Sequence, residues 1–243
     1  MPHFSRRRPA EVRWERGITG VVAVATDLEG TLTTGQTWRA LGAYLVAHGR
    51  GSAYRRMFAR NLPSALMARS GLVALEVVRE RWMLGLLSLF RGDAVESFDE
   101  ASAWAVEHVL WPQRRPEVIA ALRVHQAAGE RLVLASGAFQ PVVEAFARRL
   151  PQPTRTPAPT AIGSPVAVRD GRLAGGLDGP LNVGDAKARR LHETLGDERL
   201  YAAYGDSGDD VPMLLLSDRP VAVYPDRVLR RTASDLGWSV FEP

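Results

Sequence analysis

The segment VVAVATDLEGTL, residues 21–32, joins a short apolar run to a polar turn. Its first half, 21–26, is rich in valine and lacks the polar alternation of a half-exposed strand. It therefore predicts a strand covered on both faces, as in a parallel sheet. Two carboxylates, Asp27 and Glu29, follow this strand. Because sites in open α/β sheets lie at the carboxyl ends of strands, the segment predicts both a fold class and a place for chemistry.

From Pro116 to the end of the sequence, helical and strand patterns alternate. Further strands are expected at 131–135, 200–204, 220–223 and 238–241, with helices between them. The pair Asp170-Gly171 between two short runs predicts a β-hairpin. Strands that alternate with helices predict a mostly parallel sheet with helices on both faces, which is a Rossmann-like, three-layer α/β/α core.

Residues 36–111 differ from this pattern, because helical periodicity runs through them with only short breaks. They predict an all-helical cap inserted after the first strand. We therefore expect three parts: a basic, flexible leader at 1–17, a catalytic core formed by 18–35 and 112–243, and the helical cap at 36–111.

The composition narrows the possible functions. The 243 residues carry a net charge of +4 and no cysteine, which excludes disulfides, thiolate zinc sites and cysteine nucleophiles. Most of the positive charge lies in the leader, so no nucleic acid partner is expected. No apolar stretch approaches the ~18 residues of a membrane span. The arginine-rich start before the apolar run resembles a signal peptide, but a buried strand explains that run better, and we expect a cytoplasmic protein.

Polar side chains follow three of the expected strands. Asp27 and Glu29 follow the first, Ser136-Gly137 the second, and the segment Gly205–Asp210 the third. Carboxylates that converge at one sheet edge repel each other unless a cation lies between them. Oxygen ligands without cysteine favour Mg²⁺.

The sequence contains a single lysine, Lys187, against 30 arginines. An ammonium group is a compact point charge, whereas a guanidinium group is a broad planar fork. A lone lysine in this background therefore indicates a site in which arginine would not serve, although a chance surface lysine is the alternative.

With these motifs the sequence resembles the haloacid dehalogenase (HAD) superfamily, specifically subfamily IB, the phosphoserine-phosphatase-like branch with a helical cap. The four family motifs occur in order as Asp27-Leu28-Glu29-Gly30-Thr31, Ser136, Lys187, and Gly205-Asp206 with Asp210. The resemblance implies that Asp27 is the nucleophile and that Glu29 is the general acid and base. It implies that Mg²⁺ is held by Asp27, the backbone carbonyl of Glu29 and Asp206, with Asp210 binding directly or orienting the other ligands. It also implies that Ser136, the Gly137 N–H and Lys187 hold the phosphate.

Two positions depart from the family pattern. Glu29 stands where most relatives have aspartate, which lengthens the acid/base side chain by one methylene but keeps its chemistry. Gln36 stands where phosphoserine phosphatases have the glutamate that binds the substrate amine, so phosphoserine becomes a doubtful substrate. Arg55 and Arg56 are candidates for reaching the site from the cap, although a solvated helix face is the alternative.

These observations predict a Mg²⁺-dependent phosphatase that hydrolyses a small phosphomonoester through an aspartyl-phosphate intermediate. Two alternatives remain: a phosphotransferase that uses the same intermediate, and a catalytically weak binding or scaffold module with the same fold. The sequence does not determine the oligomeric state or the physiological substrate.

Overall fold

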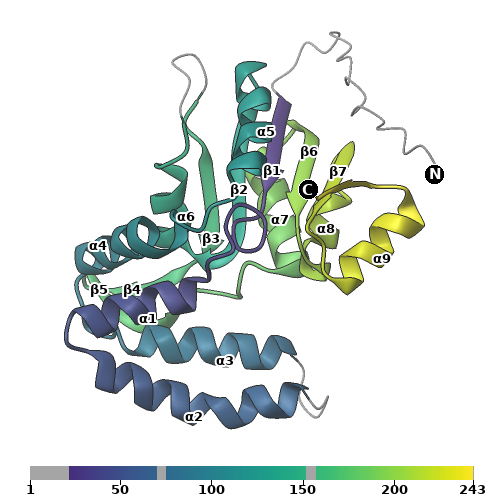
Figure 1. The fold of residues 1–243 in the computed structure, drawn as a ribbon. Helices are drawn as coiled ribbons and strands as arrows, with labels where there is room; N and C mark the ends of the chain where they lie inside the picture. The colour runs from purple at the N-terminus through teal and green to yellow at the C-terminus, as the bar shows by residue number, and fades with distance from the viewer. Residues whose placement is uncertain (1–21, 70–74, 152–156, 243) are drawn as a thin grey trace, which may run out of the picture.

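The computed structural model describes residues 22–69, 75–151 and 157–242, so the expected leader at 1–17 lies outside the described residues. Six parallel strands form the central sheet, in the order β3-β2-β1-β6-β7-β8 (Figure 1). The strands are β1 (Val22–Thr26), β2 (Arg131–Phe139), β3 (Thr160–Ser164), β6 (Arg199–Gly205), β7 (Arg219–Val223) and β8 (Ser239–Phe241). The mostly parallel α/β fold predicted from the sequence is confirmed.

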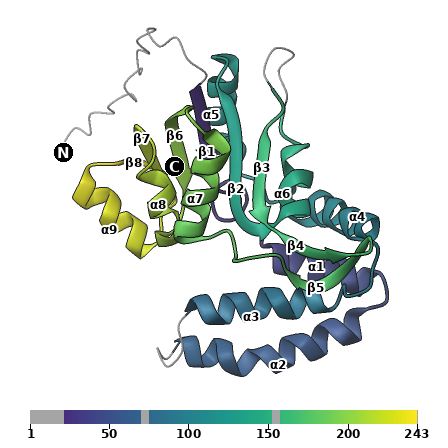
Figure 2. The same ribbon diagram turned by 180° about the vertical axis from the view of Figure 1, so that it is seen from behind.

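Helices cover both faces of the sheet (Figures 1 and 2). Val24 of β1 packs in the core with α5 (Pro116–Ala127) and α6 (Gln140–Ala147). Ala23 and Ala25 face the opposite core, formed with α7 (Gly184–Leu195), α8 (Val211–Leu214) and α9 (Arg227–Leu236). Because successive side chains of a strand point to opposite faces, burial on both faces accounts for the continuous apolar run of β1.

Between β1 and α5 the chain forms an insertion, whose described residues, 37–69 and 75–110, are mostly helical. It contains α1 (Thr37–Ala47), α2 (Gly51–Arg69), α3 (Leu75–Ser88), α4 (Val95–Ala105) and a π-helical turn at Val106–Leu110. Helix α4 packs against α6 of the core, while α2 and α3 extend away below the sheet (Figure 1). Among the described residues, no helix has both the length and the apolar character needed to cross a bilayer.

A hairpin from the second half of the chain packs against this insertion. Strands β4 (Val166–Arg169) and β5 (Arg172–Leu177) pair through a turn in which Asp170 and Gly171 have positive φ, as the sequence predicted. The hairpin lies beside α3 rather than in the central sheet (Figure 2). Backbone hydrogen bonds join Leu173 to Gly92 and Asp93 at 2.9 Å each. The position of the hairpin on the insertion was not predicted.

Candidate active site

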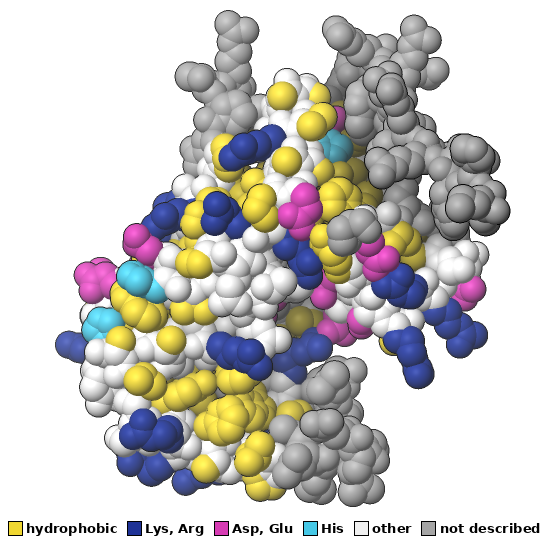
Figure 3. Space-filling model, in the orientation of Figure 1, with side chains coloured by type: hydrophobic (Ala, Val, Ile, Leu, Met, Phe, Trp, Pro, Cys, Tyr) yellow, Lys and Arg dark blue, Asp and Glu magenta, His cyan; other side chains and the backbone are white. Residues whose placement is uncertain are grey.

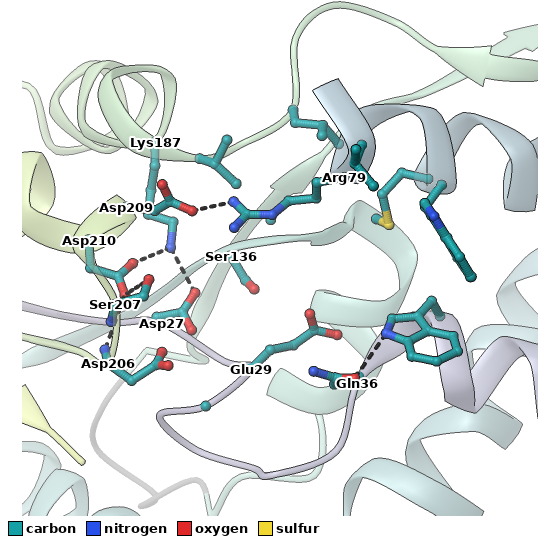
Figure 4. Close-up of a pocket in the computed structure, with 18 of the residues that line it drawn as sticks. Asp27, Glu29, Gln36, Arg79, Ser136, Lys187, Asp206, Ser207, Asp209 and Asp210 are labelled. Carbon is teal, nitrogen blue, oxygen red and sulfur yellow. Dashed lines mark hydrogen bonds and ion pairs between the residues drawn. The ribbon is translucent and has the colours of Figure 1, made fainter. Parts of the chain in front are cut away.

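A cleft of about 510 Å³ lies where the carboxyl ends of β1, β2 and β6 face the insertion. In the space-filling view, a hollow separates the two parts, with acidic side chains on its core side (Figure 3). Figure 4 shows Asp27, Ser136, Lys187, Asp206 and Asp210 pointing toward one another on the core side. The structure therefore brings together the residues that the strand-end argument predicted to converge, with Lys187, which the family resemblance implied, among them.

Asp27 lies directly after β1 and is almost fully buried. Its backbone N–H donates to the carbonyl of Tyr204 at 2.9 Å, which extends the β1–β6 pairing by one residue and fixes where the side chain begins. The turn continues through Gly30, whose φ is +91°. A Cβ at this position would lie 2.1 Å from Oδ2 of Asp206, so only glycine allows the first and last motifs to approach this closely.

Lys187 lies in the first turn of α7 and is 2% exposed. Its Nζ donates to Oδ1 of Asp27 at 2.7 Å and to Oδ1 of Asp210 at 2.6 Å. Burial by itself lowers the pKa of Lys187, but attraction to Asp210 and Asp27 outweighs burial and raises the pKa above its ordinary value. The single lysine of the chain is therefore a buried cation between two carboxylates, not a surface residue.

Asp27, Asp206 and Asp210 form a cluster in which each offers an oxygen within 4.8 Å of the others. Burial, and then repulsion from Asp27 and Asp210, raises the pKa of Asp206 to about 8. Burial raises the pKa of Asp27 to about 7, against the opposing attraction of Lys187. Three carboxylates with one ammonium leave a net negative charge that a divalent cation would neutralise, and an all-oxygen donor set fits Mg²⁺.

Asp210 also holds the loop that carries Asp206. Its Oδ2 accepts hydrogen bonds from the backbone N–H groups of Asp206 and Ser207 and from the Ser207 hydroxyl, each at 3.1 Å. Its Oδ1 accepts from Lys187. Asp210 therefore orients Asp206 and Lys187, and its carboxylate also lies within reach of a cation held by the cluster.

Ser136 is buried within β2, and two residues that were not predicted support it. The fully buried Asn182 donates from Nδ2 to the carbonyl of Ser136 at 3.1 Å and to that of Ile162 at 2.9 Å. The hydroxyl of Ser164 donates to the carbonyl of Gly137 at 2.8 Å and accepts from the backbone N–H of Asn182. No local sequence pattern connects these positions, because they meet only when β2, β3 and the segment before α7 come together.

The Glu29 carboxylate accepts a hydrogen bond from the backbone N–H of Thr37, the first residue of α1. Gln36, at the N-cap position of α1, makes no capping hydrogen bond with its side chain, so Glu29 satisfies a helix N-terminus from outside the helix. Burial raises the pKa of Glu29, and the hydrogen bonds from Thr37 oppose this rise. The proton-transfer candidate is therefore joined to the first helix of the insertion.

Comparison with known proteins agrees with this geometry. Residues 24–215 match the family model of the haloacid dehalogenase-like hydrolases. The chain belongs to this family. It is 32% identical to the "Inhibition of morphological differentiation protein" of Streptomyces azureus over 168 residues, which are 67% of this chain and 58% of that protein. It is 29% identical to Protein CicA of Caulobacter vibrioides over 80% of this chain and 82% of that protein.

Solved structures of HAD hydrolases share this fold. A Bordetella pertussis protein of unknown function superposes with a TM-score of 0.74 at 24% identity, covering 92% of this chain and 99% of that one. A phosphoserine phosphatase with a phospho-aspartyl intermediate analogue superposes with a TM-score of 0.56 at 16% identity over 91% of both chains. By sequence alone, the chain is also 32% identical to a phosphoserine phosphatase of Mycobacterium tuberculosis, over 49% of this chain and 38% of that protein. The solved structures show a shared fold, and the family that the chain belongs to is one of hydrolases.

The insertion side of the HAD cleft differs from the sequence prediction. Gln36 lines the cleft, but its Oε1 accepts a hydrogen bond from Nε1 of Trp38 at 2.9 Å. Arg55 and Arg56 are exposed on α2 and do not line the cleft, so of the two interpretations given for them, the solvated helix face agrees with the structure and contact with the site does not. The physical reason is that α3 lies between α2 and the core (Figure 1).

Among the described residues of the insertion, Arg79 of α3 is the cation that lines the cleft. Its guanidinium forms an ion pair with Asp209, which lies beside Asp210 in the last motif (Figure 4). The sequence offered a signal for Asp209, because it belongs to the acidic run after β6. It offered none for Arg79, which is one of 30 arginines and stands out only by its position in space.

Proposed function

We propose that this HAD hydrolase is a Mg²⁺-dependent phosphatase that hydrolyses a small phosphomonoester through an aspartyl phosphate on Asp27. The observation that carries the proposal is the buried Lys187 ammonium, which contacts Asp27 and lies among the carboxylates of the cluster. A cation in this position can hold a phosphate anion beside an anionic nucleophile, which phosphoryl transfer requires.

Each candidate residue has a step in this reaction. An oxygen of the Asp27 carboxylate attacks phosphorus, and the bond from phosphorus to the leaving oxygen breaks. The Ser136 hydroxyl, the Gly137 N–H and Lys187 bind the phosphate oxygens. Glu29 donates its proton to the leaving oxygen; its raised pKa favours the protonated form that this step requires. Glu29 then takes a proton from water, whose oxygen attacks phosphorus and releases inorganic phosphate and the free Asp27 carboxylate.

Asp27, Asp206 and the backbone carbonyl of Glu29 would hold Mg²⁺, with Asp210 orienting them. When bound, the ion would neutralise charge on the phosphate oxygens. The fit rests on the oxygen donors of the cluster and on its charge, because three carboxylates face a single ammonium group.

We also propose that residues 36–111 act as a cap domain over the cleft. The contacts that support this role are those of Arg79 with Asp209 and of Thr37 with Glu29, because each joins the insertion to a catalytic loop. Such a lid would separate the bound substrate from bulk solvent during the reaction and would complete the arrangement of groups around it.

The test is turnover of p-nitrophenyl phosphate and of a panel of phosphomonoesters, with Mg²⁺ and with a chelator. We expect Mg²⁺-dependent release of inorganic phosphate, which also identifies water as the acceptor. Asp27→Asn should lose turnover and fail to retain ³²P after acid quenching, whereas Asp185→Asn, an exposed aspartate of α7, should retain both. Near-normal turnover in Asp27→Asn would contradict the proposal.

A further inference from the structure

The two ends of the cleft differ in chemistry. The end at the sheet is polar and contains the carboxylates and Lys187. The end at the insertion is formed largely by apolar side chains. These are Trp38, Val78, Trp82 and Met83. We call these four residues the apolar wall. Two apolar residues of the segment before α7, Leu181 and Val183, also line the cleft, and Val183 lies beside Gly137.

The aromatic part of the apolar wall is held in place by ring contacts. Trp82 meets Trp38 edge-on with ring centroids 5.5 Å apart, and meets Phe58 of α2 edge-on at 5.0 Å. Trp38 is also fixed by its hydrogen bond to Gln36. Rings that are ordered before binding lose little freedom when a ligand covers them, which favours tight apolar contact.

The four residues of the apolar wall carry no charge that could pair with a charge on the alcohol part of the substrate. Arg79, the charged residue of α3 that lines the cleft, is already paired with Asp209. The carboxylates that line the cleft lie with the catalytic loops; Glu29 accepts from Thr37 and Asp209 pairs with Arg79. A substrate ammonium group at the wall would therefore be desolvated without an anionic partner, which is costly. The Gln36 amide oxygen is already engaged by Trp38.

We propose that the apolar wall binds the alcohol part of the substrate, and that this part is an uncharged alkyl or aryl group rather than an amino acid. The inference rests on the proposed phosphatase function. The phosphate would lie at Lys187, and the group beyond the ester oxygen would extend toward Trp38, Trp82 and Met83. Its burial would remove both the group and the wall from water, which supplies the binding free energy.

The test compares alkyl phosphates of increasing length, from ethyl to hexyl phosphate, with 2-phenylethyl phosphate and phosphoserine. The leaving oxygen is a primary alkoxide throughout the alkyl series, so a trend in kcat/KM reports apolar contact rather than leaving-group activation. We expect kcat/KM to rise by up to about fourfold for each methylene that becomes buried. The phenylethyl ester then shows whether a ring or a flexible chain fits better, and phosphoserine should be the poorest substrate.

Two variants test whether the wall causes the preference. Trp82→Ala should lower kcat/KM for hexyl phosphate relative to ethyl phosphate by about tenfold or more. Val78→Thr, which keeps the side-chain shape and so guards against loss of folding, should lower the same ratio by a smaller factor. The control is Trp104→Ala in α4, which stacks on His108 and does not line the cleft; it should leave the ratio unchanged.

The outcomes separate this inference from the proposed function. If acetyl phosphate and p-nitrophenyl phosphate are not hydrolysed, the phosphatase proposal fails. If they are hydrolysed while kcat/KM is flat along the alkyl series, or while phosphoserine is preferred, only the apolar wall is overturned. A chain-length trend that Trp82→Ala and Val78→Thr leave intact would likewise overturn it.

Discussion

Replacement of Lys187 by arginine tests the role assigned to this residue most directly, because it keeps the positive charge and changes only the shape of the side chain. Lys187 is 2% exposed and makes hydrogen bonds of 2.7 and 2.6 Å to two carboxylates from different loops. A guanidinium group is longer and planar and cannot place one donor at the same point. A hydrogen bond to a charged group contributes about 1.5–3 kcal/mol.

The expected loss of activity follows from these contacts. If the displaced cation loses contacts of this strength with the transferring phosphate and with Asp27 in the transition state, the cost is about 3–6 kcal/mol, which is roughly a 10²- to 10⁴-fold fall in kcat/KM. The larger side chain in a closed site should also lower the free energy of unfolding by about 1–3 kcal/mol. The assay is kcat/KM for p-nitrophenyl phosphate at saturating Mg²⁺, with thermal denaturation as the measure of folding.

Arg189→Lys on the exposed face of the same helix is the matched control and should change neither quantity appreciably. If Lys187→Arg keeps kcat/KM within about threefold of the unaltered protein, then the single lysine is not required as a point charge. The role assigned to it between Asp27 and the phosphate would then be wrong.

Three further predictions concern proton transfer, the cleft and the metal. Glu29→Gln should lower kcat by about 10²- to 10⁴-fold for alkyl phosphates and by clearly less for aryl phosphates, whose leaving groups need little protonation; an equal loss for both would contradict its role as general acid. Arg79→Gln should raise KM about three- to tenfold, because Asp209 then repels the substrate phosphate without a neutralising partner. Adding Asp209→Asn to this variant should reverse the increase in KM. If the effects of the two substitutions on KM were purely additive, the coupling between Arg79 and Asp209 would be refuted. Burial raises the pKa of Asp206 to about 8 and that of Asp27 to about 7 in the metal-free protein, so these groups make it less stable as pH rises from about 4 to 8. At a pH below these raised pKa values, Mg²⁺ must displace protons in order to bind. The rise in Tm on adding Mg²⁺ should therefore be larger at pH 9 than at pH 6, and equal rises would contradict the assignment.

Local sequence patterns were enough to predict the buried central strand and the hairpin turn of this HAD hydrolase. The valine-rich run before Asp27 indicated a strand buried on both faces, and the structure places it between β2 and β6 with a core on each side. Asp170-Gly171 indicated the hairpin turn through its backbone preference alone. These predictions succeeded because strand burial and turn conformation leave a signal within a few consecutive residues.

Local sequence patterns did not predict how the helices of the insertion pack. Helical periodicity located its helices, but it did not determine which helix faces the core, so Arg55 and Arg56 were suggested where the structure places Arg79. The hairpin was predicted, but its place beside α3 was not. Helix docking depends on contacts between residues far apart in the sequence, and periodicity within one helix does not encode its partner.

By itself, the sequence determined the order of the motifs, the parallel sheet and the sheet edge where Asp27, Ser136 and Asp206 meet, whereas Lys187 was added by its being the single lysine and by the family resemblance. The physical reason is that parallel strands must end at a common edge, so residues that follow the strands are brought together by topology alone. The tertiary structure alone decided which side chains face them across the cleft. The Arg79–Asp209 pair, the bond from Thr37 to Glu29 and the apolar wall arise from the packing of α1 and α3 over that edge, and this packing depends on complementary surfaces that no single segment contains.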